Sequence, residues 1–441
     1  MTRTFRSWSH LLPTRSAEVA GQAGWLAQLR EGSCRIAPRG AGRSFGDAAY
    51  AAQGQVTCAA PAPDGAWLRA RIAGLAAGTA PSLTVPAGLA LGDLHRVLAV
   101  HGLSFPVFGG TQWATVGGAT AGDIHGKNHR QVGSFGNHVA GLTLVTGRGD
   151  TLSCGPGDNP DVFRATIGGM GMTGYISEVT LRLRRQAARS LTAEYRTLGD
   201  LEAVHDWLKR GQAEALFVSW PDLAATRPTA IGFRATAGTQ PCELPRPRRH
   251  VPVPRLPLVN ATTARAAAAL CRRWLQDAPG VDRHSFAVHY AGVHESIHGW
   301  NRLFPIGGMI EYHFACPLDR FAALLDDLRR QARAAGLPLL CAVAKPFGSV
   351  PPVGDLSFAR DGIGLNFQMP WSQTSVRFLR AYTDAVLAAG GRINLTKDAV
   401  IMPDHYARAT PELDRWRATL DAIDPARRVE TALGRRLRLR G

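Results

Sequence analysis

The feature that most constrains this chain is a run of glycine turns over residues 109–139, which reads GGTQWATVGGATAGDIHGKNHRQVGSFGNHV. Glycine carries no side chain, so its backbone can turn sharply and can approach a ligand closely. Polar residues separate the successive glycines in this run. The pattern therefore predicts a backbone that threads closely around a large planar or phosphorylated ligand.

Three histidines in the same run, His125, His129 and His138, raise the question of a zinc site. Zinc ligands need a rigid common frame, and Gly126 and Gly133 interrupt any helix that the histidines could share. We therefore expect these histidines to be solvated or to contact a cofactor, and we expect no metal.

A second glycine cluster, RGAGRSFGD at residues 39–47, could hold a pyrophosphate, since its backbone N–H groups and its arginine and serine side chains are donors. Its spacing differs from the dinucleotide motif G-x-G-x-x-G, and it has no Lys-Ser/Thr pair of a Walker loop. From the residues alone, an anion-binding loop and a plain turn are both open.

Two further motifs match known patterns but lie in the wrong context. GMGMTG at 169–174 fits G-x-G-x-x-G, yet the alternating pattern of residues 179–184 predicts a strand, where a nicotinamide site needs a helix. HESIH at 294–298 fits the zinc-protease motif H-E-x-x-H, but Gly292 and Gly299 leave too short a helix. We interpret the second motif as a surface turn.

The length of 441 residues predicts two or three domains at about 100 to 200 residues each. Residues 35–185 have the pattern of an α+β unit, and the prolines of 241–257 exclude a helix or central strand there. Residues 310–395 predict a strand-helix-strand order twice: strands at 310–314, 339–345, 362–369 and 392–395, helices at 319–335 and 375–389. That order favours a ferredoxin-like antiparallel sheet with both helices on one face.

Charge and cysteine content bear on partners and compartment. The chain has 51 Lys and Arg against 34 Asp and Glu, a net charge of +17, which favours an anionic partner or simply a solvated basic surface. Its seven cysteines are scattered without a CxxC pair, as expected in a reducing compartment. No apolar run is long enough for a membrane span, and the start lacks the apolar stretch of a signal peptide. We expect a cytoplasmic protein, with membrane association left open.

Three segments together resemble a known family: RGAGRSFGD at 39–47, the run at 109–139, and GGMGMTGYI at 168–176. They are similar to the FAD domain of the vanillyl-alcohol-oxidase (PCMH) type, and more closely to the decaprenylphosphoryl-β-D-ribose 2′-oxidase family. The likeness continues to the C-terminus through short segments that include Trp300-Asn301-Arg302, Lys345-Pro346-Phe347-Gly348 and Thr396-Lys397-Asp398.

The resemblance implies an α+β protein of two domains, with an FAD-binding domain at 1–187, a substrate (cap) domain at 188–391, and a segment at 392–441 that returns to the first domain. It implies FAD as the cofactor. Related oxidases can carry the flavin on a histidine of the first loop, where this chain has Arg43-Ser44-Phe45, so we expect non-covalent FAD. The implied cofactor-binding residues are Arg39, Gly40, Ala41, Gly42, Arg43, Ser44, Phe45, Gly46, Asp47, Gly110, Thr115, Val116, Gly117, Gly118, Gly122, Asp123, Ile124, His125, Gly126, Asn128, Ile176 and Asn394.

The chemistry that the resemblance implies is oxidation of a secondary alcohol, which needs a hydride acceptor and a relay for the hydroxyl proton. Lys397 is the first candidate for the relay, because burial could depress its pKa toward neutrality. Tyr312 and His125 are the other candidates. Lys127 and Lys345 suit a sugar phosphate. The expected substrate-binding residues are Lys127, Trp220, Tyr312, Lys345, Asn366 and Lys397.

Several residues depart from the family pattern: Asn366 replaces a common cysteine, Gly364 an asparagine, Phe45 a tyrosine and Arg130 a histidine. The expected substrate is a lipid-linked sugar phosphate, polyprenyl-phosphoryl ribose, oxidised at its 2′-hydroxyl, with an NAD(P)-dependent keto-reductase as partner. The basic segment 241–257 could contact an anionic membrane. Alternatives are an oxidase of a free sugar or aldonolactone and, remotely, a nucleic-acid-binding protein, although we expect no nucleic-acid partner.

Overall fold

The computed structural model describes residues 2–11, 14–32, 34–61, 65–75, 81–107, 109–185, 189–210, 216–223, 229–241, 256–260, 262–263, 266, 269–270, 273, 282–285, 300–305 and 307–441. The HESIH motif at 294–298 and residues 242–255 of the proline-rich segment lie outside the described residues. Within the described part, no helix is both long enough and apolar enough to cross a membrane.

The first sheet contains four short strands, β1 (Thr2–Phe5), β2 (Thr14–Ala20), β4 (Gln55–Cys58) and β3 (Ile36–Arg39), in that order. β4 pairs in parallel with both β2 and β3, and helix α1 (Gly21–Glu31) provides the crossover that parallel strands require. Trp25 of α1 is fully buried and donates a hydrogen bond through Nε1 to the carbonyl of Thr146, at 3.2 Å. This contact joins the first sheet to the second.

The second sheet is antiparallel and contains β5 (Ser82–Pro86), β9 (Tyr175–Arg182), β7 (Val139–Val145) and β8 (Thr151–Cys154), in that order. β9 confirms the predicted strand after the GMGMTG motif. Helix α3 (Leu91–Val100) turns an apolar face toward the core, because Leu91, Leu94 and Leu98 are fully buried. Shorter elements are α2 (Gly65–Ala73), β6 (Leu103–Ser104), α4 (Val116–Ala121), α5 (His129–Val132), a 3-10 turn at Phe135–His138, α6 (Pro160–Thr166) and β10 (Arg184–Arg185).

The third sheet has eight strands in the order β14-β11-β13-β12-β16-β17-β15-β18. Their bounds are β11 (Arg189–Leu198), β12 (Leu216–Asp222), β13 (Thr229–Pro241), β14 (Asp282–Ser285), β15 (Met309–Cys316), β16 (Leu340–Phe347), β17 (Gly362–Pro370) and β18 (Arg392–Ile393). Among the described residues, the neighbouring strands of this sheet pair antiparallel throughout. The expected α+β class, with antiparallel sheets, is therefore confirmed.

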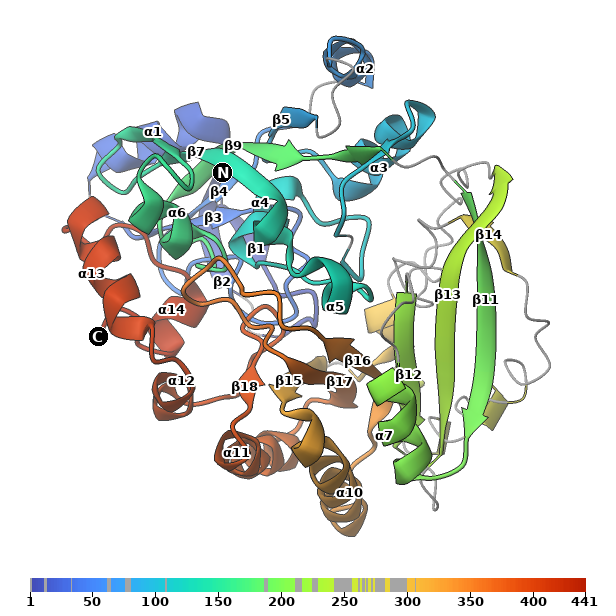
Figure 1. The fold of residues 1–441 in the computed structure, drawn as a ribbon. Coiled ribbons are helices and arrows are strands. Elements are labelled where there is room, and N and C mark those ends of the chain that lie inside the picture. Colours follow the sequence, from blue (N-terminus) through green and yellow to red (C-terminus); the bar gives the residue numbers. More distant parts are fainter. Residues whose placement is uncertain are drawn as a thin grey trace.

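Three helices, α7 (Leu201–Arg210), α10 (Leu318–Ala334) and α11 (Gln373–Ala388), cover one face of the eight-stranded sheet (Figure 1). Their apolar residues form one core with the inward side chains of β15, β16 and β17. The predicted strand and helix order of residues 310–395 is confirmed, with the last strand shortened to two residues. On the other face of the sheet, Phe347 of β16 packs against His125 and His129 of the N-terminal part, and this face carries the site described below.

The C-terminal segment runs through α12 (Pro403–Ala409), α13 (Leu413–Ile423) and α14 (Ala432–Arg436) and lies beside the N-terminal sheets (Figure 1). The backbone N–H of Ala432 donates to Tyr50 O at 2.8 Å, and that of Leu433 donates to Asp47 O at 3.1 Å. The indole of Trp416 in α13 donates to Ala165 O at 3.0 Å. The end of the chain is therefore part of the support of the 39–47 loop.

Candidate active site

The two glycine-rich segments lie side by side. A Cβ atom at Gly40 would lie 2.4 Å from Thr115 Oγ1, so only glycine allows the 39–47 loop to approach Thr115 so closely. Thr115 in turn caps α4 by accepting a hydrogen bond from the N–H of Gly118, at 3.1 Å. Arg43 of the loop stacks on the indole of Trp8, with its guanidinium carbon 4.4 Å from the ring centroid.

Asp123 holds the run at 109–139 together. Its Oδ1 accepts a hydrogen bond from the N–H of Gly136 at 2.7 Å, and the segment pairs with itself through a bridge between His125 and Ser134. Asp123 is buried and has a φ of 38°, which a non-glycine residue adopts only where its surroundings impose it. Burial raises the pKa of Asp123. The expected close threading of this segment is thus present in its geometry.

The C-terminal turn at 394–398 meets both glycine-rich segments. The N–H of Phe45 donates to Thr396 O at 3.0 Å, and a Cβ atom at Gly46 would lie 1.6 Å from Asp398 O. A Cβ atom at Gly122 would lie 2.8 Å from the methyl group of Thr396. The structure therefore brings the 39–47 loop, the 115–128 segment and the turn that bears Lys397 to one place.

Polar side chains on β15, β16 and β17 form the opposite wall of the site. Cross-strand pairing puts Glu311 beside Gln368, His313 beside Asn366, and Lys345 beside Gly364, so these residues share one face. We call these six residues the polar face of the sheet.

Tyr312 does not belong to the polar face, so its prediction as a catalytic and substrate-binding residue is wrong. Successive side chains of a strand point to opposite faces, and Tyr312 is fully buried on the helix side. Its hydroxyl bonds to Thr383 Oγ1 of α11 at 2.8 Å.

Glu311 and His313 are site residues that the sequence prediction missed. Residues 310–314 and 365–369 alternate apolar and polar side chains, and this period of two could have placed 311, 313, 366 and 368 together.

Glu311 and Lys397 form a buried ion pair at the edge of the polar face. Glu311 Oε1 accepts hydrogen bonds from Lys397 Nζ and from Asn366 Nδ2 (3.2 Å), and its Oε2 accepts one from Gln368 Nε2 at 2.9 Å. Lys397 Nζ also lies 5.4 Å from the ring centroid of Phe45. The amine of Lys397 therefore lies against a buried carboxylate and close to an aromatic ring.

The lysines with lowered pKa values are Lys127 and Lys345. Burial lowers the pKa of Lys127 to about 8. Burial, with the charges of Lys397 and Lys127, lowers the pKa of Lys345 to about 7, against a smaller opposite effect of Glu311. Lys127 Nζ lies 5.8 Å from the ring centroid of Phe233 on β13. Both lysine side chains keep some exposure, so a ligand can reach them.

The histidines pack in an aromatic cluster with Phe347 and Phe358. The ring centroid of His125 lies 4.8 Å from that of Phe347 and 5.1 Å from that of His313. Burial lowers the pKa of His125 and His313 well below 6.5 and that of His129 to about 4, so all three are neutral near pH 7. Among the residues that the structure describes, no three side chains are placed to hold a metal ion.

The remaining predicted residues are placed as follows. Asn128 donates through Nδ2 to Pro106 O at 2.9 Å, and Ile124 packs against Gly109. Ile176 lies in β9 with its side chain in the core, and Val116 is fully buried. Asn394 follows β18 and bonds to His313 and Thr396. Trp220 belongs to β12, and its side chain is outside the described part of the chain.

The glycines of the run at 109–139 test whether FAD would fit there. Cβ atoms at Gly109, Gly117 and Gly136 would clash with neighbouring protein atoms. A Cβ atom at Gly110 would meet nothing within 4 Å, and one at Gly118 would meet only Thr115 Oγ1. The backbone at Gly110 and Gly118 is therefore open to a ligand, and Arg43 brings a positive charge to the same segment, 5.8 Å from the ring centroid of Trp113. These residues fit a dinucleotide with an anionic pyrophosphate.

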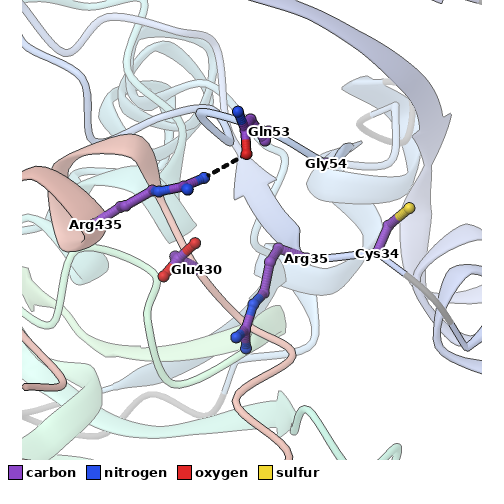
Figure 2. Close-up of a pocket in the computed structure, with 6 residues that line it drawn as sticks. All are labelled: Cys34, Arg35, Gln53, Gly54, Glu430 and Arg435. Atoms are coloured by element: carbon purple, nitrogen blue, oxygen red, sulfur yellow. Dashed lines mark hydrogen bonds between the residues drawn. The ribbon is translucent and has the colours of Figure 1, made fainter.

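A separate surface pocket of about 420 Å³ lies where the C-terminal segment meets β3 and β4. Figure 2 shows the bond across it, from Arg435 Nη1 to Gln53 Oε1 at 2.9 Å. Its lining residues are Cys34, Arg35, Gln53, Gly54, Glu430 and Arg435. None of these was predicted as a site residue, and we assign the pocket no role in the reaction.

Comparisons with known proteins bear on the cofactor and on the type of enzyme. Residues 23–155 match a family model described as an FAD binding domain. Decaprenylphosphoryl-beta-D-ribose oxidase of Mycolicibacterium smegmatis is 29% identical over 99% of this chain and 96% of its own length. An uncharacterized protein of Streptomyces coelicolor is 30% identical over 78% of this chain and its whole length. D-arabinono-1,4-lactone oxidase of Yarrowia lipolytica is 25% identical over 62% of this chain and 53% of its own length.

Proposed function

Because this chain belongs to the decaprenylphosphoryl-ribose oxidase family of PCMH-type FAD-binding oxidoreductases, we propose that it oxidises the 2′-hydroxyl of polyprenyl-phosphoryl-β-D-ribose to the ketone. The chain is an FAD-dependent oxidoreductase that acts on a CH–OH group. The sugar and its lipid carrier are the proposed part. The reaction would supply the arabinose donor of cell-envelope glycans after an NAD(P)-dependent keto-reductase has reduced the ketone.

The observation that carries the proposed substrate is the state of Lys127 and Lys345. Glu311 balances the charge of Lys397, whereas the surroundings of the other two lysines lower their pKa values to about 8 and about 7. A phosphoryl group between these two amines would stabilise their charged forms and would raise both pKa values. A free sugar or a lactone carries no such charge, so the lysines favour the phosphorylated substrate.

The ion pair of Lys397 and Glu311 supports a role in removing the hydroxyl proton. When bound, FAD supplies the acceptor for the hydride that leaves the alcohol carbon. Lys397 can take the hydroxyl proton while it passes one of its own protons to Glu311 Oε1, since Nζ already donates to that oxygen. Glu311 is then the net proton acceptor, and Asn366 and Gln368 keep its carboxylate in position.

The cofactor is proposed to be dissociable. The 39–47 loop carries Arg43, Ser44 and Phe45 and contains no histidine that could bond to a flavin. Acid precipitation should therefore release the yellow colour into the supernatant, and colour that stays in the protein pellet would contradict this.

We also propose the division into residues 1–187, 188–391 and 392–441, with a ferredoxin-like unit in the middle part. The strand order β16-β17-β15-β18, with α10 and α11 on one face, supports that assignment. It would make the ferredoxin-like unit the support of the polar face.

A peripheral membrane contact would let the protein reach a lipid-linked substrate. Leu256, within the basic segment 241–257, and Leu258 and Leu270, which follow it in the sequence, are 47%, 54% and 69% exposed. Exposed apolar side chains beside positive charge are suited to an anionic membrane surface. Co-sedimentation with anionic liposomes should fall when residues 242–255 are deleted, and unchanged co-sedimentation would exclude this contact.

The substrate proposal is tested by binding to Lys345→Met. The variant should weaken the binding of polyprenyl-phosphoryl ribose about 10-fold or more, because a charge-assisted hydrogen bond is lost. It should leave the binding of a free aldonolactone unchanged. The exposed Lys209→Met, on α7, is the matched control.

The pH dependence of this binding has a defined sign. Because the pKa of Lys345 is about 7 in the empty site, the wild-type affinity should fall as pH rises above that value. Lys345→Met should flatten this dependence. If Lys345→Met instead loses affinity equally for the phosphorylated and the free sugar, the lactone-oxidase alternative is favoured.

A further inference from the structure

The side chain of Asn394 has a fixed orientation. Its Oδ1 accepts two hydrogen bonds from Thr396, one from the backbone N–H at 3.0 Å and one from Oγ1 at 2.7 Å. The amide nitrogen is therefore the group that faces His313 Nδ1, at 3.1 Å. Because Nδ2 of an asparagine can only donate, His313 Nδ1 must accept.

This bond decides the tautomer of His313. A neutral imidazole has one donor and one acceptor nitrogen, so an accepting Nδ1 leaves the proton on Nε2. Burial lowers the pKa of His313 well below 6.5, and the nearby Lys397, His125 and Lys345 act in the same direction. Glu311 is the carboxylate on the same strand face, and it is already bound to Lys397. His313 is thus a neutral donor near pH 7.

The Nε2 side of the His313 ring lies toward Gly364 on the polar face of the sheet. Nδ1 faces Asn394, which follows β18 on one side of β15, and Nε2 faces Gly364 of β17 on the other side. A Cβ atom at Gly364 would lie 3.2 Å from Nε2. Because residue 364 is glycine, it places no side chain next to Nε2. Nε2 is buried and has no hydrogen-bond partner among the described residues.

A buried donor without a partner is costly unless a ligand completes it. The ring centroid of His313 lies 5.1 Å from that of His125 and 4.6 Å from that of Phe358, and Phe347 lies against Gly364 beside it. The same strand face bears Glu311, the net proton acceptor of the proposed reaction.

We propose that His313 is a catalytic residue whose Nε2–H donates a hydrogen bond to the oxygen of the alcohol being oxidised. Asn394 is then a positioning residue that keeps the proton on Nε2. The donor stabilises the negative charge that grows on this oxygen as its proton leaves toward Lys397 and Glu311. The inference rests on the proposed oxidation of an alcohol, but it does not depend on which sugar carries the hydroxyl.

The tautomer is tested first, without any substrate. Long-range ¹H–¹⁵N correlation of histidine-labelled, flavin-loaded protein should show His313 as the neutral Nε2–H form at pH 7, assigned by the signal that His313→Gln removes. Asn394→Asp replaces the donor with a carboxylate, so Nδ1 should become protonated, whereas Thr396→Val keeps the amide donor and should leave the tautomer unchanged. An Nδ1–H form in the wild type would overturn the proposal, whatever the substrate is.

The contact with substrate is tested by the rate of flavin reduction with the sugar that reduces the wild type. His313→Leu should slow reduction about 100-fold, as expected when one donor to a developing oxyanion is lost. His313→Gln should recover part of the rate, because glutamine also offers an N–H donor. The visible flavin spectrum without substrate should be the same in all three proteins.

Two outcomes of that second test would overturn the contact with substrate. One is an unchanged rate in His313→Leu. The other is a flavin spectrum that shifts in His313→Leu before any substrate is added, which would assign the donor to the cofactor. If polyprenyl-phosphoryl ribose fails but a free lactone reduces the flavin, the proposed substrate fails and the same comparison is made with the lactone.

Discussion

Single residues determine the charge of the site. Glu311 is almost fully buried, 2% exposed at its side chain, and forms an ion pair with Lys397, while burial lowers the pKa of Lys127 to about 8 and that of Lys345 to about 7. The site therefore contains one lysine paired with a carboxylate and two lysines whose charged forms a bound anion would stabilise.

At this scale we predict the effect of Glu311→Gln. The amide can keep the bonds to neighbouring side chains but cannot accept the proton passed through Lys397. The rate of flavin reduction should fall by about 10² to 10⁴, the range for loss of a proton-transfer group. FAD should stay bound, because Glu311 does not touch the 39–47 loop in the described structure.

The matched control for Glu311→Gln is Glu194→Gln. Glu194 also pairs with a basic residue, Arg234, but both side chains are 45% exposed. Its loss should leave the rate unchanged and should cost at most about 1 kcal/mol of stability. A rate in Glu311→Gln equal to that of this control would remove Glu311 from the proton path.

At the scale of elements, the turn at 394–398 is pressed against the 39–47 loop. Phe45 donates its N–H to Thr396 O, and Gly46 lies so close to Asp398 that no side chain fits between them. The loop proposed to hold the pyrophosphate and the turn that bears Lys397 therefore form one packed unit. A change in one of them should displace the other.

We predict that Gly46→Ala loses both FAD and activity. Its Cβ atom would lie 1.6 Å from a backbone oxygen, which cannot move away without shifting the turn. The flavin content of the purified protein should drop well below one per chain. Gly157→Ala is the control, since a Cβ atom there meets nothing within 4 Å. Full flavin content in Gly46→Ala would contradict the proposed place of the pyrophosphate.

At the scale of the whole molecule, Arg436 connects the C-terminal segment to the 39–47 loop. It donates through Nε and Nη2 to the two oxygens of Asp47, both at 2.8 Å, and through Nη2 to Asp398 at 2.8 Å. Both carboxylates are at most 2% exposed, and they raise the pKa of the guanidinium. One C-terminal side chain thus binds both the 39–47 loop and the turn at 394–398.

Arg436→Met should therefore lower the free energy of unfolding by about 3 to 5 kcal/mol, because it leaves two buried carboxylates unpaired. Added FAD should recover part of the lost stability, since a ligand that binds only the folded state stabilises it. Thermal unfolding with and without FAD measures both effects. Arg435→Met, which loses an exposed bond to Gln53, should change little, and equal losses for the two variants would refute the role of Arg436.

The sequence was sufficient for the order of the elements and for the glycine-rich side of the site. Periods of 3.6 and 2 residues mark the helices and strands of 310–395, and glycines reveal where the backbone needs room. It was not sufficient for the polar face. Whether Glu311, Tyr312 or His313 lies on the polar face depends on which face of the sheet the helices cover. The covered face is decided by the packing of distant residues such as Leu328 and Val386.

The ion-pair partner of Lys397 was also beyond the sequence. Its ion pair joins residues 86 positions apart in the chain, so no local pattern announces it. The same holds for Asn394, expected at the cofactor, whose side chain bonds to His313 and Thr396. The division into domains and the roles of Ile176 and Trp220 stay predictions.

The most direct test of the central claim is an anaerobic titration of the FAD-loaded protein with polyprenyl-phosphoryl ribose, read at the visible flavin band. We predict that the band bleaches in proportion to the sugar added and that the 2′-keto product appears in equal amount. A band that stays unchanged with this sugar, or protein that takes up no flavin when incubated with FAD, would contradict the account.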